Sequence, residues 1–171
     1  MRDVSKLEAR IRPGLPDESK SSQQLTARDR RSLVCVTGEA LWISSVTISA
    51  PDPRALAAFY QRLLGWTVTA SEGPRPGESV EAGWAQLRAP DGAAGLTTIN
   101  IEYEKHFIRP TWPSSPGTQH ITVHMDLPTT DIDAAERHAI EAGAVTAQFQ
   151  PQDGVRVMID PAGHPFCLFQ T

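Results

Sequence analysis

Two neighbouring stretches near residue 50 decide the fold: VTISA at residues 46–50 and DPRALAAFYQRLLG at residues 52–65. Apolar and polar residues alternate in the first stretch, which is typical of a half-buried strand. In the second, Asp52 is a favoured N-cap residue, and Pro53 suits the first helical position. The apolar side chains that follow recur at helical spacing, and Gly65 provides a helix stop. The two stretches therefore predict a strand and then a helix that ends at Gly65.

The same order of signals recurs later in the chain, where Asp131 and Gly143 are the counterparts of Asp52 and Gly65. Residues 120–127 alternate between polar and apolar, which predicts a strand whose apolar side chains face the second helix. Those apolar residues are Ile121, Val123, Met125 and Leu127. The chain therefore contains an internal repeat of a strand, a capped helix and a glycine stop.

Three further strand-like segments, separated by turn-forming residues, follow each predicted helix. They span residues 66–71, 83–89 and 96–104 in the first half, and residues 144–150, 155–159 and 165–170 in the second. The sequence therefore predicts an α+β fold of two βαβββ modules. We expect the modules to form a cupped mixed sheet with the helices on its outer face.

The domain organisation follows from where the aromatic residues lie. Residues 1–40 contain no Phe, Trp or Tyr, so they cannot bury enough apolar area to offset the entropy lost on ordering. We expect a flexible N-terminal extension over residues 1–40 and a domain over residues 41–171. Within that domain, module one spans residues 43–106, a proline-rich linker spans 107–117, and module two spans 118–171.

Composition and charge exclude several classes of protein. The chain has 171 residues, of which 40% are hydrophobic and 21% charged, and its formal net charge of −4 argues against nucleic acid as a partner. No stretch approaches the roughly 20 apolar residues that span a bilayer, and no signal peptide is evident. The two cysteines, Cys35 and Cys167, cannot form a disulfide framework. We therefore expect a cytoplasmic protein that makes no contact with membranes or nucleic acids.

The strand alternation also predicts which residues line a cavity. Helices on one face of a sheet leave a polar opposite face, which must be solvated, paired or used to enclose a ligand. We expect a small-molecule pocket on that face, although Trp84 can equally be a core residue, and Cys167, which lies between Phe166 and Leu168, is favoured as a core residue. The predicted pocket residues are Ser45, Thr47, Trp84, Gln86, Asn100, Thr122 and Cys167.

Several motifs resemble those of a known superfamily. They are DPRALAAFY and LGW at residues 52–60 and 64–66, and HMDL, DIDAAE and DPAGHPFCL at residues 124–127, 131–136 and 160–168. These motifs are similar to those of the vicinal oxygen chelate superfamily, which includes glyoxalase I, bleomycin-resistance proteins and extradiol dioxygenases. PTWP at residues 110–113 is similar to a glyoxalase-like subgroup. The resemblance covers residues 43–171 and is more specific for the fold than for the chemistry.

The resemblance also implies positions for metal ligands, because metal-using members take them from the first and last strand of each module. Those positions fall on Ser45, Glu102, His124 and Cys167. Glu102 and His124 are good ligands for Zn, Fe, Mn or Ni, and Glu102 is also the expected catalytic carboxylate, with an ordinary surface charge as the alternative. Ser45 is a poor ligand, and Cys167 would suit a soft metal. His124 can also be a metal-free pocket group or a structural histidine.

Two functions remain open at this point. The first is a divalent-metal-dependent lyase, isomerase or dioxygenase, in which Glu102 and His124 hold the metal and a carboxylate moves the proton. The alternative is a metal-free protein that binds or sequesters a drug-like small molecule, as bleomycin-resistance relatives do. Both require one small-molecule ligand or substrate. Both are compatible with a monomer or a homodimer.

Overall fold

The computed structural model describes residues 43–93 and 95–171, and within them two βαβββ modules follow one another as predicted. The predicted extension over residues 1–40 lies outside the described residues. The first module consists of β1 (Val46–Ala50), α1 (Pro53–Leu64), β2 (Thr67–Glu72), β3 (Trp84–Arg88) and β4 (Thr98–Tyr103). The second consists of β5 (Met125–Thr129), α2 (Ile132–Ala142), β6 (Val145–Thr146), β7 (Val155–Ile159) and β8 (Pro165–Gln170).

Both helices begin and end at the residues that the sequence predicts. The side chain of Asp52 accepts hydrogen bonds from two backbone N–H groups in the first turn of α1, at 3.1 and 3.0 Å. Asp131 accepts one from the first turn of α2, at 2.9 Å. Gly65 and Gly143 end the helices with φ angles of 66° and 116°, in the left-handed region that favours glycine. Local capping chemistry therefore sets the length of each helix.

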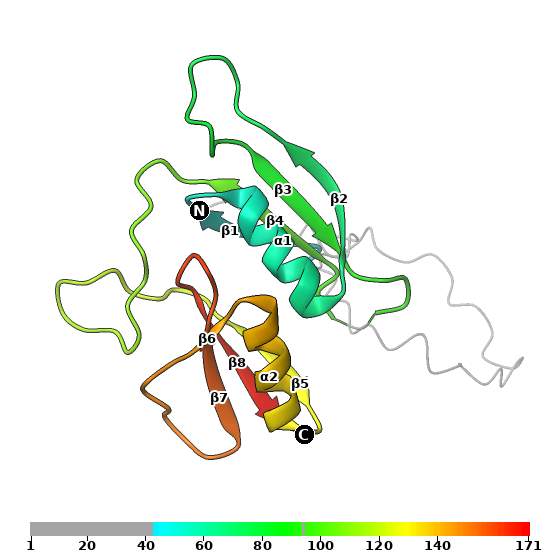
Figure 1. Ribbon diagram of the computed structural model, residues 1–171, viewed down its shortest axis with the longest axis vertical. Coiled ribbons are helices and arrows are strands. Elements are labelled where there is room, and N and C mark those ends of the chain that lie inside the picture. Colours follow the sequence, from blue (N-terminus) through cyan, green and yellow to red (C-terminus); the bar gives the residue numbers. More distant parts are fainter. Residues whose placement is uncertain (1–42, 94) are drawn as a thin grey trace, which may run out of the picture. The chain divides into compact units, whose positions relative to one another are not determined.

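Each module forms one four-stranded mixed sheet, which confirms the α+β fold. The strand orders are β1-β4-β3-β2 and β5-β8-β7-β6. In each sheet the first and last strands of the module pair in parallel, and the other neighbours are antiparallel. Figure 1 shows α1 against the first sheet and α2 against the second. One face of each sheet is thereby covered by a helix, and the opposite face has no helix against it.

The apolar core is continuous between the two modules. Phe59 and Tyr60 of α1 are fully buried, and the ring of Phe59 lies 4.9 Å from that of Tyr60 and 6.2 Å from that of Phe166 on β8. Each such side chain contributes about 1.5–3 kcal/mol by leaving water. Other members of the core are Leu56, Leu87, Ile99, Ile101, Met158 and Leu168. Helix α1 therefore packs on strands of both modules.

The C-terminal ends of the two helices also form hydrogen bonds with one another. Nε and Nη2 of Arg62 on α1 donate to the carbonyl oxygen of Ala142, the last residue of α2, at 3.0 and 2.8 Å. In return, Nε2 of His138 on α2 lies 3.0 Å from the carbonyl oxygen of Leu63 near the end of α1. The last carbonyls of a helix have no partner within the helix, so these contacts stabilise both ends and join the modules.

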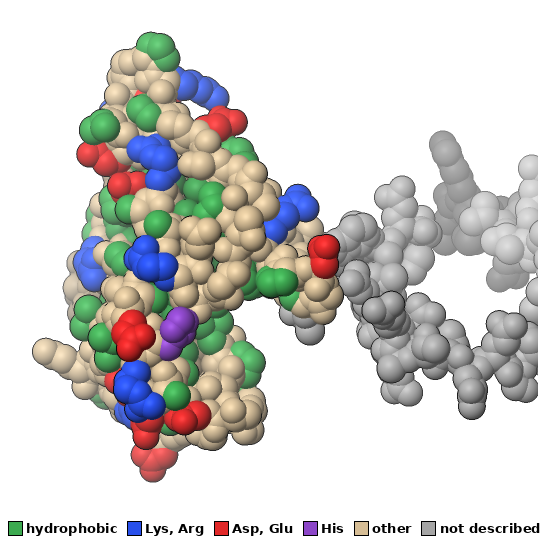
Figure 2. All heavy atoms as spheres, turned by 45° about the vertical axis from the view of Figure 1, so that its right-hand side comes forward, with side chains coloured by type: hydrophobic (Ala, Val, Ile, Leu, Met, Phe, Trp, Pro, Cys, Tyr) green, Lys and Arg blue, Asp and Glu red, His purple; other side chains and the backbone are tan. Residues whose placement is uncertain are grey.

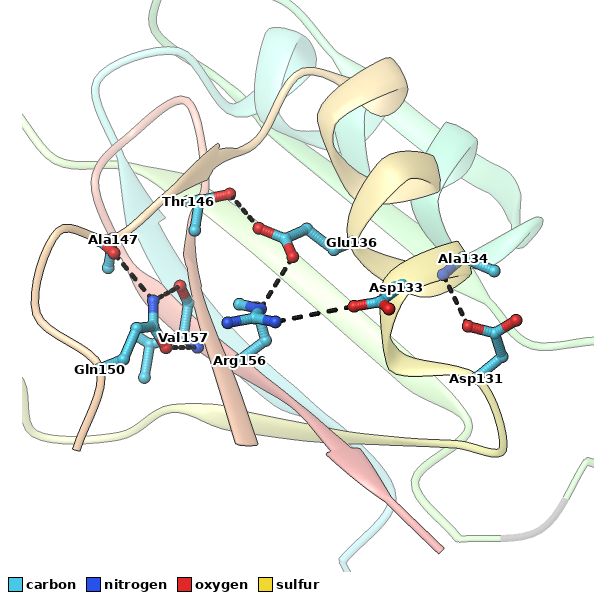
Figure 3. A network of polar contacts seen from close by, with 9 residues as sticks. All are labelled: Asp131, Asp133, Ala134, Glu136, Thr146, Ala147, Gln150, Arg156 and Val157. Carbon is cyan, nitrogen blue, oxygen red and sulfur yellow. Dashed lines mark hydrogen bonds and ion pairs between the residues drawn. The ribbon is translucent and has the colours of Figure 1, made fainter. Parts of the chain in front are cut away.

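A polar network fastens α2 to its own sheet. Figure 3 shows Arg156 of β7 pointing between two carboxylates of α2. Its Nε lies 2.8 Å from Glu136 Oε2, and its Nη2 lies 3.7 Å from Asp133 Oδ1. The hydroxyl of Thr146 on β6 donates to the other oxygen of Glu136 at 2.6 Å. These contacts fix the helix over β6 and β7.

The first strand of module two begins later than the alternation predicts. Strand β5 starts at Met125, and the preceding residues are not paired, so Val123 is 65% exposed instead of facing the helix. The reason is the position at which its partner strand, β8, begins. Met125 pairs with Phe166, and β8 begins at Pro165, directly after a turn. The chain before Met125 has no backbone partner there and instead forms the wall of a cavity.

Strand β6 is likewise shorter than the predicted segment at 144–150, because a side chain replaces part of its ladder. Nε2 of Gln150 donates to the carbonyl oxygens of Ala147 and Val157, at 2.8 and 3.0 Å. Its Oε1 accepts from the backbone N–H of Val157 at 2.8 Å (Figure 3). One glutamine therefore supplies hydrogen bonds that a longer strand would have made.

The surface shows no dominant charge on the face in Figure 2, where lysine, arginine, aspartate and glutamate side chains are interspersed with apolar ones. Interspersed charges of both signs do not create the strong field that steers a highly charged partner. Among the described residues, neither helix has the length and apolar character needed to cross a membrane.

Candidate functional site

A cavity of about 360 Å³, which we call the β1 pocket, lies between the two modules. One wall is β1, another is the unpaired segment before β5, and a third is the chain at residues 104–110. Its volume falls at the lower end of the range of about 300–1,000 Å³ that is usual for small-molecule sites. Its apolar lining includes Val46, Ile48, Phe107, Ile121, Val123 and Met125. Both modules are therefore needed to form it.

Histidines are concentrated in this pocket. Four of the five histidines in the chain line it, namely His106, His120, His124 and His164. They come from three separate segments, and Glu104 is the one carboxylate among the described lining residues. Imidazole can donate or accept hydrogen bonds and changes charge near neutral pH. The pocket therefore combines an apolar body with several adaptable polar groups.

A buried carboxylate orients one of these histidines. Asp160 is 1% exposed, and its Oδ2 accepts the hydroxyl of Tyr60 at 2.9 Å and Nδ1 of His164 at 3.0 Å. Its Oδ1 accepts the backbone N–H groups of Gly163 and His164, at 2.7 and 2.9 Å. Asp160 thus holds the Nδ1 side of the His164 ring, so Nε2 is the nitrogen left to meet a ligand. Both Tyr60 and His164 line the β1 pocket.

This arrangement gives a prediction for alkaline stability. Burial, together with the charge of Asp160 and the hydrogen bond to it, raises the pKa of Tyr60 well above its ordinary value of about 10. A raised folded-state pKa contributes stability that is complete below pH 10 and is lost as the pH rises through the folded value. We expect the free energy of unfolding to fall above about pH 10, and to fall less steeply in Tyr60→Phe.

Urea denaturation between neutral pH and pH 11 would measure this slope. Tyr103→Phe is the matched control, because Tyr103 is the other tyrosine of the chain and is half-buried at the end of β4. If the free energy of unfolding fell equally steeply with pH in the parent and in Tyr60→Phe, the loss of alkaline stability would not come from Tyr60.

A second group of polar side chains lies on the open face of the second sheet. One potential ligand atom from each of His124, Asp126 and Cys167 lies within 4.8 Å of the other two. His124 Nε2 is 3.5 Å from Asp126 Oδ1, and Asp126 lies directly opposite Cys167 in the pairing of β5 with β8. Burial raises the pKa of the Cys167 thiol, and the charge of Asp126 and a hydrogen bond to it raise this pKa further.

This trio borders a second cavity of about 480 Å³, which we call the β8 cavity. Its apolar walls include Trp112, Val155, Val157 and Phe169. His124 lines both this cavity and the β1 pocket, so the two cavities meet at one histidine.

The structure divides the predicted site residues into groups. Thr47, Thr122 and His124 line the β1 pocket, whereas Cys167 lines the β8 cavity with His124. The remaining predicted residues line neither cavity; they are Ser45, Trp84, Gln86, Asn100 and Glu102. Glu102 is exposed on β4, opposite Ser49 of β1 and Trp84 of β3.

The two predicted amide residues form a polar row on the open face of the first sheet. Nε2 of Gln86 donates to Oδ1 of Asn100 at 3.0 Å, and the hydroxyl of Thr69 donates to Oε1 of Gln86 at 3.1 Å. Asn100 lies opposite Thr47 in the parallel pairing of β1 with β4. The row therefore begins at the edge of the β1 pocket and extends away from it.

Sequence reasoning did not identify Tyr60, Asp160, Asp126 or the pocket histidines other than His124 as site residues. A signal existed for Asp126, because residues two apart on a strand share a face and Asp126 follows His124 by two. No local signal joins Tyr60 to Asp160, which are 100 residues apart.

Comparisons with known proteins agree with this architecture. The profile of the glyoxalase-like domain family matches residues 45–169. No curated protein sequence matches the chain significantly. Solved structures from several bacteria share the fold at low sequence identity.

The first is a possible glyoxalase from Bacillus cereus, with 16% identity, a TM-score of 0.52, and coverage of 76% of this chain and 99% of that one. The second is a glyoxalase family protein from Enterococcus faecalis, with 23% identity, a TM-score of 0.53, and coverage of 75% and 97%. The third is the fosfomycin resistance protein FosX from Listeria monocytogenes, complexed with Mn(II) and 1S,2S-dihydroxypropylphosphonic acid. It has 17% identity, a TM-score of 0.55, and coverage of 76% and 92%. With its two βαβββ modules, this chain belongs to the glyoxalase-like domain family, within the vicinal oxygen chelate superfamily.

Proposed function

We propose that the protein binds one small organic molecule in the β1 pocket. The observation that carries this proposal is the pocket itself, because walls from both modules enclose an apolar space of suitable volume. Four histidines and the hydroxyls of Thr47 and Thr122 provide the polar groups that orient a ligand. The proposed ligand has an apolar body and at least one hydrogen-bonding group.

The metal centre implied by the superfamily does not fit the residues at its four positions. Ser45 offers a hydroxyl, which is a weak ligand, and it lines neither cavity. Glu102 is exposed and is not part of the convergent group that contains His124 and Cys167. We therefore propose that ligand binding in the β1 pocket does not depend on a metal held by those four positions.

A second candidate function is a metal-dependent lyase, isomerase or dioxygenase, in which Glu102 and His124 hold the metal. The observation in its favour is that His124 faces the pocket where a substrate would lie. The two candidates differ in what they need from Glu102. A metal-dependent enzyme should lose its metal and its substrate affinity in Glu102→Ala, whereas the metal-free pocket should be unaffected.

Blocking the pocket tests the first candidate. Thr122 is exposed and lines the β1 pocket, so Thr122→Trp should fill the cavity without disturbing the core. We expect compounds that bind the parent to bind Thr122→Trp at least about 10-fold more weakly, a loss of about 1.4 kcal/mol. Thr130→Trp is the matched control, because Thr130 is exposed and lies outside the pocket.

Ligand-observed NMR with small carboxylic acids, amides and phenols, followed by calorimetry, would provide the measurement. It would be run with a chelator and again with added Zn²⁺ or Mn²⁺. Equal affinities in the parent and Thr122→Trp would refute the pocket assignment. Binding that requires added metal and disappears in Glu102→Ala would favour the second candidate.

A further inference from the structure

We propose that His164 selects the ligand of the β1 pocket by taking the proton of a weakly acidic hydroxyl group on an apolar, unsaturated body, that is, of a phenol or an enol. This inference rests on the proposed function, because it names the class of ligand for the same pocket. It is carried by the contacts of the His164 ring, of which one nitrogen lies 3.0 Å from the buried carboxylate of Asp160 and the other is left for the ligand.

The ring of His164 is held on two sides. One is the contact of Nδ1 with Asp160, and the other is the ring of Phe107, whose centroid lies 5.6 Å away in a T-shaped arrangement. Phe107 and His164 both line the β1 pocket, and the side chain of His164 is only 18% exposed. The other three pocket histidines are exposed, so we assign the polar end of the ligand to His164.

The turn that carries His164 is also fixed through its backbone. Oδ1 of Asp160 accepts from the N–H groups of Gly163 and His164, and the N–H of Asp160 donates to the carbonyl oxygen of His164 at 2.9 Å. Nη1 of Arg109 donates to the carbonyl oxygen of Pro161 at 2.8 Å. A Cβ added at Gly163 would collide with the side chain of Arg109, so the two segments are closely packed. The imidazole is therefore oriented before any ligand arrives.

The contacts of Asp160 decide which nitrogen of His164 carries the hydrogen. An ionised carboxylate only accepts hydrogen bonds, and this one also accepts from the hydroxyl of Tyr60 and from two backbone N–H groups. Nδ1 therefore carries the hydrogen, and Nε2 of the neutral ring has a free electron pair. Such a nitrogen accepts a hydrogen bond from a hydroxyl group, whereas a carboxylate ligand has no hydrogen to donate.

The same carboxylate favours transfer of the proton to Nε2. The O–H bond of the ligand breaks and its electron pair stays on the oxygen, while a new N–H bond forms at Nε2. The resulting imidazolium lies beside the negative charge of Asp160, which is 1% exposed, so little water screens the attraction. A phenol or enol whose acidity is close to that of imidazole would therefore be held as its anion.

The rest of the pocket suits the body of such a ligand. Its apolar walls, from both modules, include Val46, Ile48, Phe107, Ile121 and Met125. The described titratable and charged groups around His164 lie in its own turn, in α1 and along the pocket lining; they are Asp160, Tyr60, Arg109, Glu104, His106, His120 and His124. Only Glu104 adds a carboxylate to the described lining, and it is exposed, so the pocket opposes a bound anion weakly.

The compounds 4-nitrophenol and 4-nitroanisole test the proposal in the full chain, with a chelator present so that metal ions contribute nothing. They share one ring, but only the phenol has an acidic hydrogen, and its absorption moves from the near ultraviolet to the visible when it ionises. We expect calorimetry to show that 4-nitrophenol binds at least about 10-fold more tightly than 4-nitroanisole. We expect the pKa of the bound phenol, read from its visible absorption, to be lower than that of the free phenol by about 1, because a cation lies beside it.

His164→Phe retains an aromatic ring and removes both nitrogens. It should bind 4-nitrophenol at least about 10-fold more weakly and should no longer lower the pKa of the phenol, whereas 4-nitroanisole should be affected less. His138→Phe is the matched control, because His138 is exposed and is the one histidine of the chain outside the pocket lining. Asp160 is a positioning residue that acts through His164, so Asp160→Asn should also abolish most of the change in the pKa of the bound phenol.

The proposal is overturned if neither compound binds the parent, if the two bind equally, or if the bound phenol ionises equally in the parent and in His164→Phe. Tighter binding of 4-nitrobenzoate, which arrives as an anion, would also overturn it and would make His164 a fixed cation. Should His164→Phe fail to fold, the comparison of the two compounds in the parent gives the decision.

Failure of this proposal is distinguishable from failure of the pocket itself. If Thr122→Trp weakens the binding of 4-nitrophenol and 4-nitroanisole alike, and the parent binds both equally, the pocket stands and the role of His164 is refuted. If Thr122→Trp binds both compounds as tightly as the parent does, their site lies elsewhere and both proposals fail.

Discussion

Replacing Asp160 with alanine is expected to lower the free energy of unfolding by about 3–5 kcal/mol, because four hydrogen-bond donors lose their buried acceptor at once. The hydroxyl of Tyr60, Nδ1 of His164 and two backbone N–H groups all donate to this carboxylate. Each donor left in the interior without a partner costs about 1–3 kcal/mol. The substitution would also remove one of the contacts between the modules, since Tyr60 belongs to α1 and Asp160 to the second module.

Urea denaturation at neutral pH measures this effect as a shift in midpoint at constant slope. Asp160→Asn preserves the volume and one acceptor oxygen, so its destabilisation should be smaller than that of Asp160→Ala. Asp153→Ala is the matched control, because Asp153 is an exposed aspartate in a loop of the same module. A loss below about 1 kcal/mol in Asp160→Ala, within the range of an ordinary surface substitution, would show that the network adds little stability.

The same substitution should also affect the β1 pocket. Asp160 fixes the ring of His164, so without it the imidazole can rotate about its side-chain bonds and no longer presents Nε2 in one direction. Compounds that contact His164 should therefore bind more weakly to Asp160→Asn even where the protein remains folded. A general structural defect would weaken the binding of all ligands equally. Loss of the orientation of the His164 ring should instead weaken most the binding of ligands that form hydrogen bonds with it.

The fold was predictable because its signals are local. Asp52 and Asp131 cap helices through backbone groups two or three residues away, and Gly65 and Gly143 end them through their own φ angles. These interactions depend on the nearest few residues alone. The repeat of the same signals then implied two modules, which the two sheets confirm.

The candidate site was only partly predictable because it depends on contacts between distant segments. The alternation at residues 120–127 correctly indicated extended chain, but the length of β5 depends on where β8 begins. Pro165 follows a turn, so the chain before Met125 lacks a partner and lines the β1 pocket. Likewise, the pairing of Asp126 with Cys167 depends on the register of β5 with β8, which could not be predicted from the sequence alone.

The second large effect is expected at Gly83, where alanine should lower the free energy of unfolding by at least about 3 kcal/mol. Gly83 has φ +127°, and a Cβ there would lie 2.1 Å from the carbonyl oxygen of Glu72. That oxygen belongs to the backbone of β2 and cannot rotate away as a side chain would. The carbonyl oxygen of Gly83 also accepts from the N–H of Tyr103 at 3.0 Å, so a shift of the backbone would disturb β4 as well.

Two other glycines separate the causes of this loss. Gly92 has φ +84° with nothing within 4 Å of an added Cβ, so Gly92→Ala should show backbone strain alone, about 1–2 kcal/mol. Gly73 has open space and no positive φ, so Gly73→Ala should be neutral or stabilise by about 0.4–1 kcal/mol through the unfolded chain. Urea denaturation of the three variants should rank them in this order. If Gly83→Ala lost no more free energy of unfolding than Gly92→Ala, the clash with Glu72 would not be costly. The backbone of β2 at Glu72 would then be able to move away from β3 at little cost in energy.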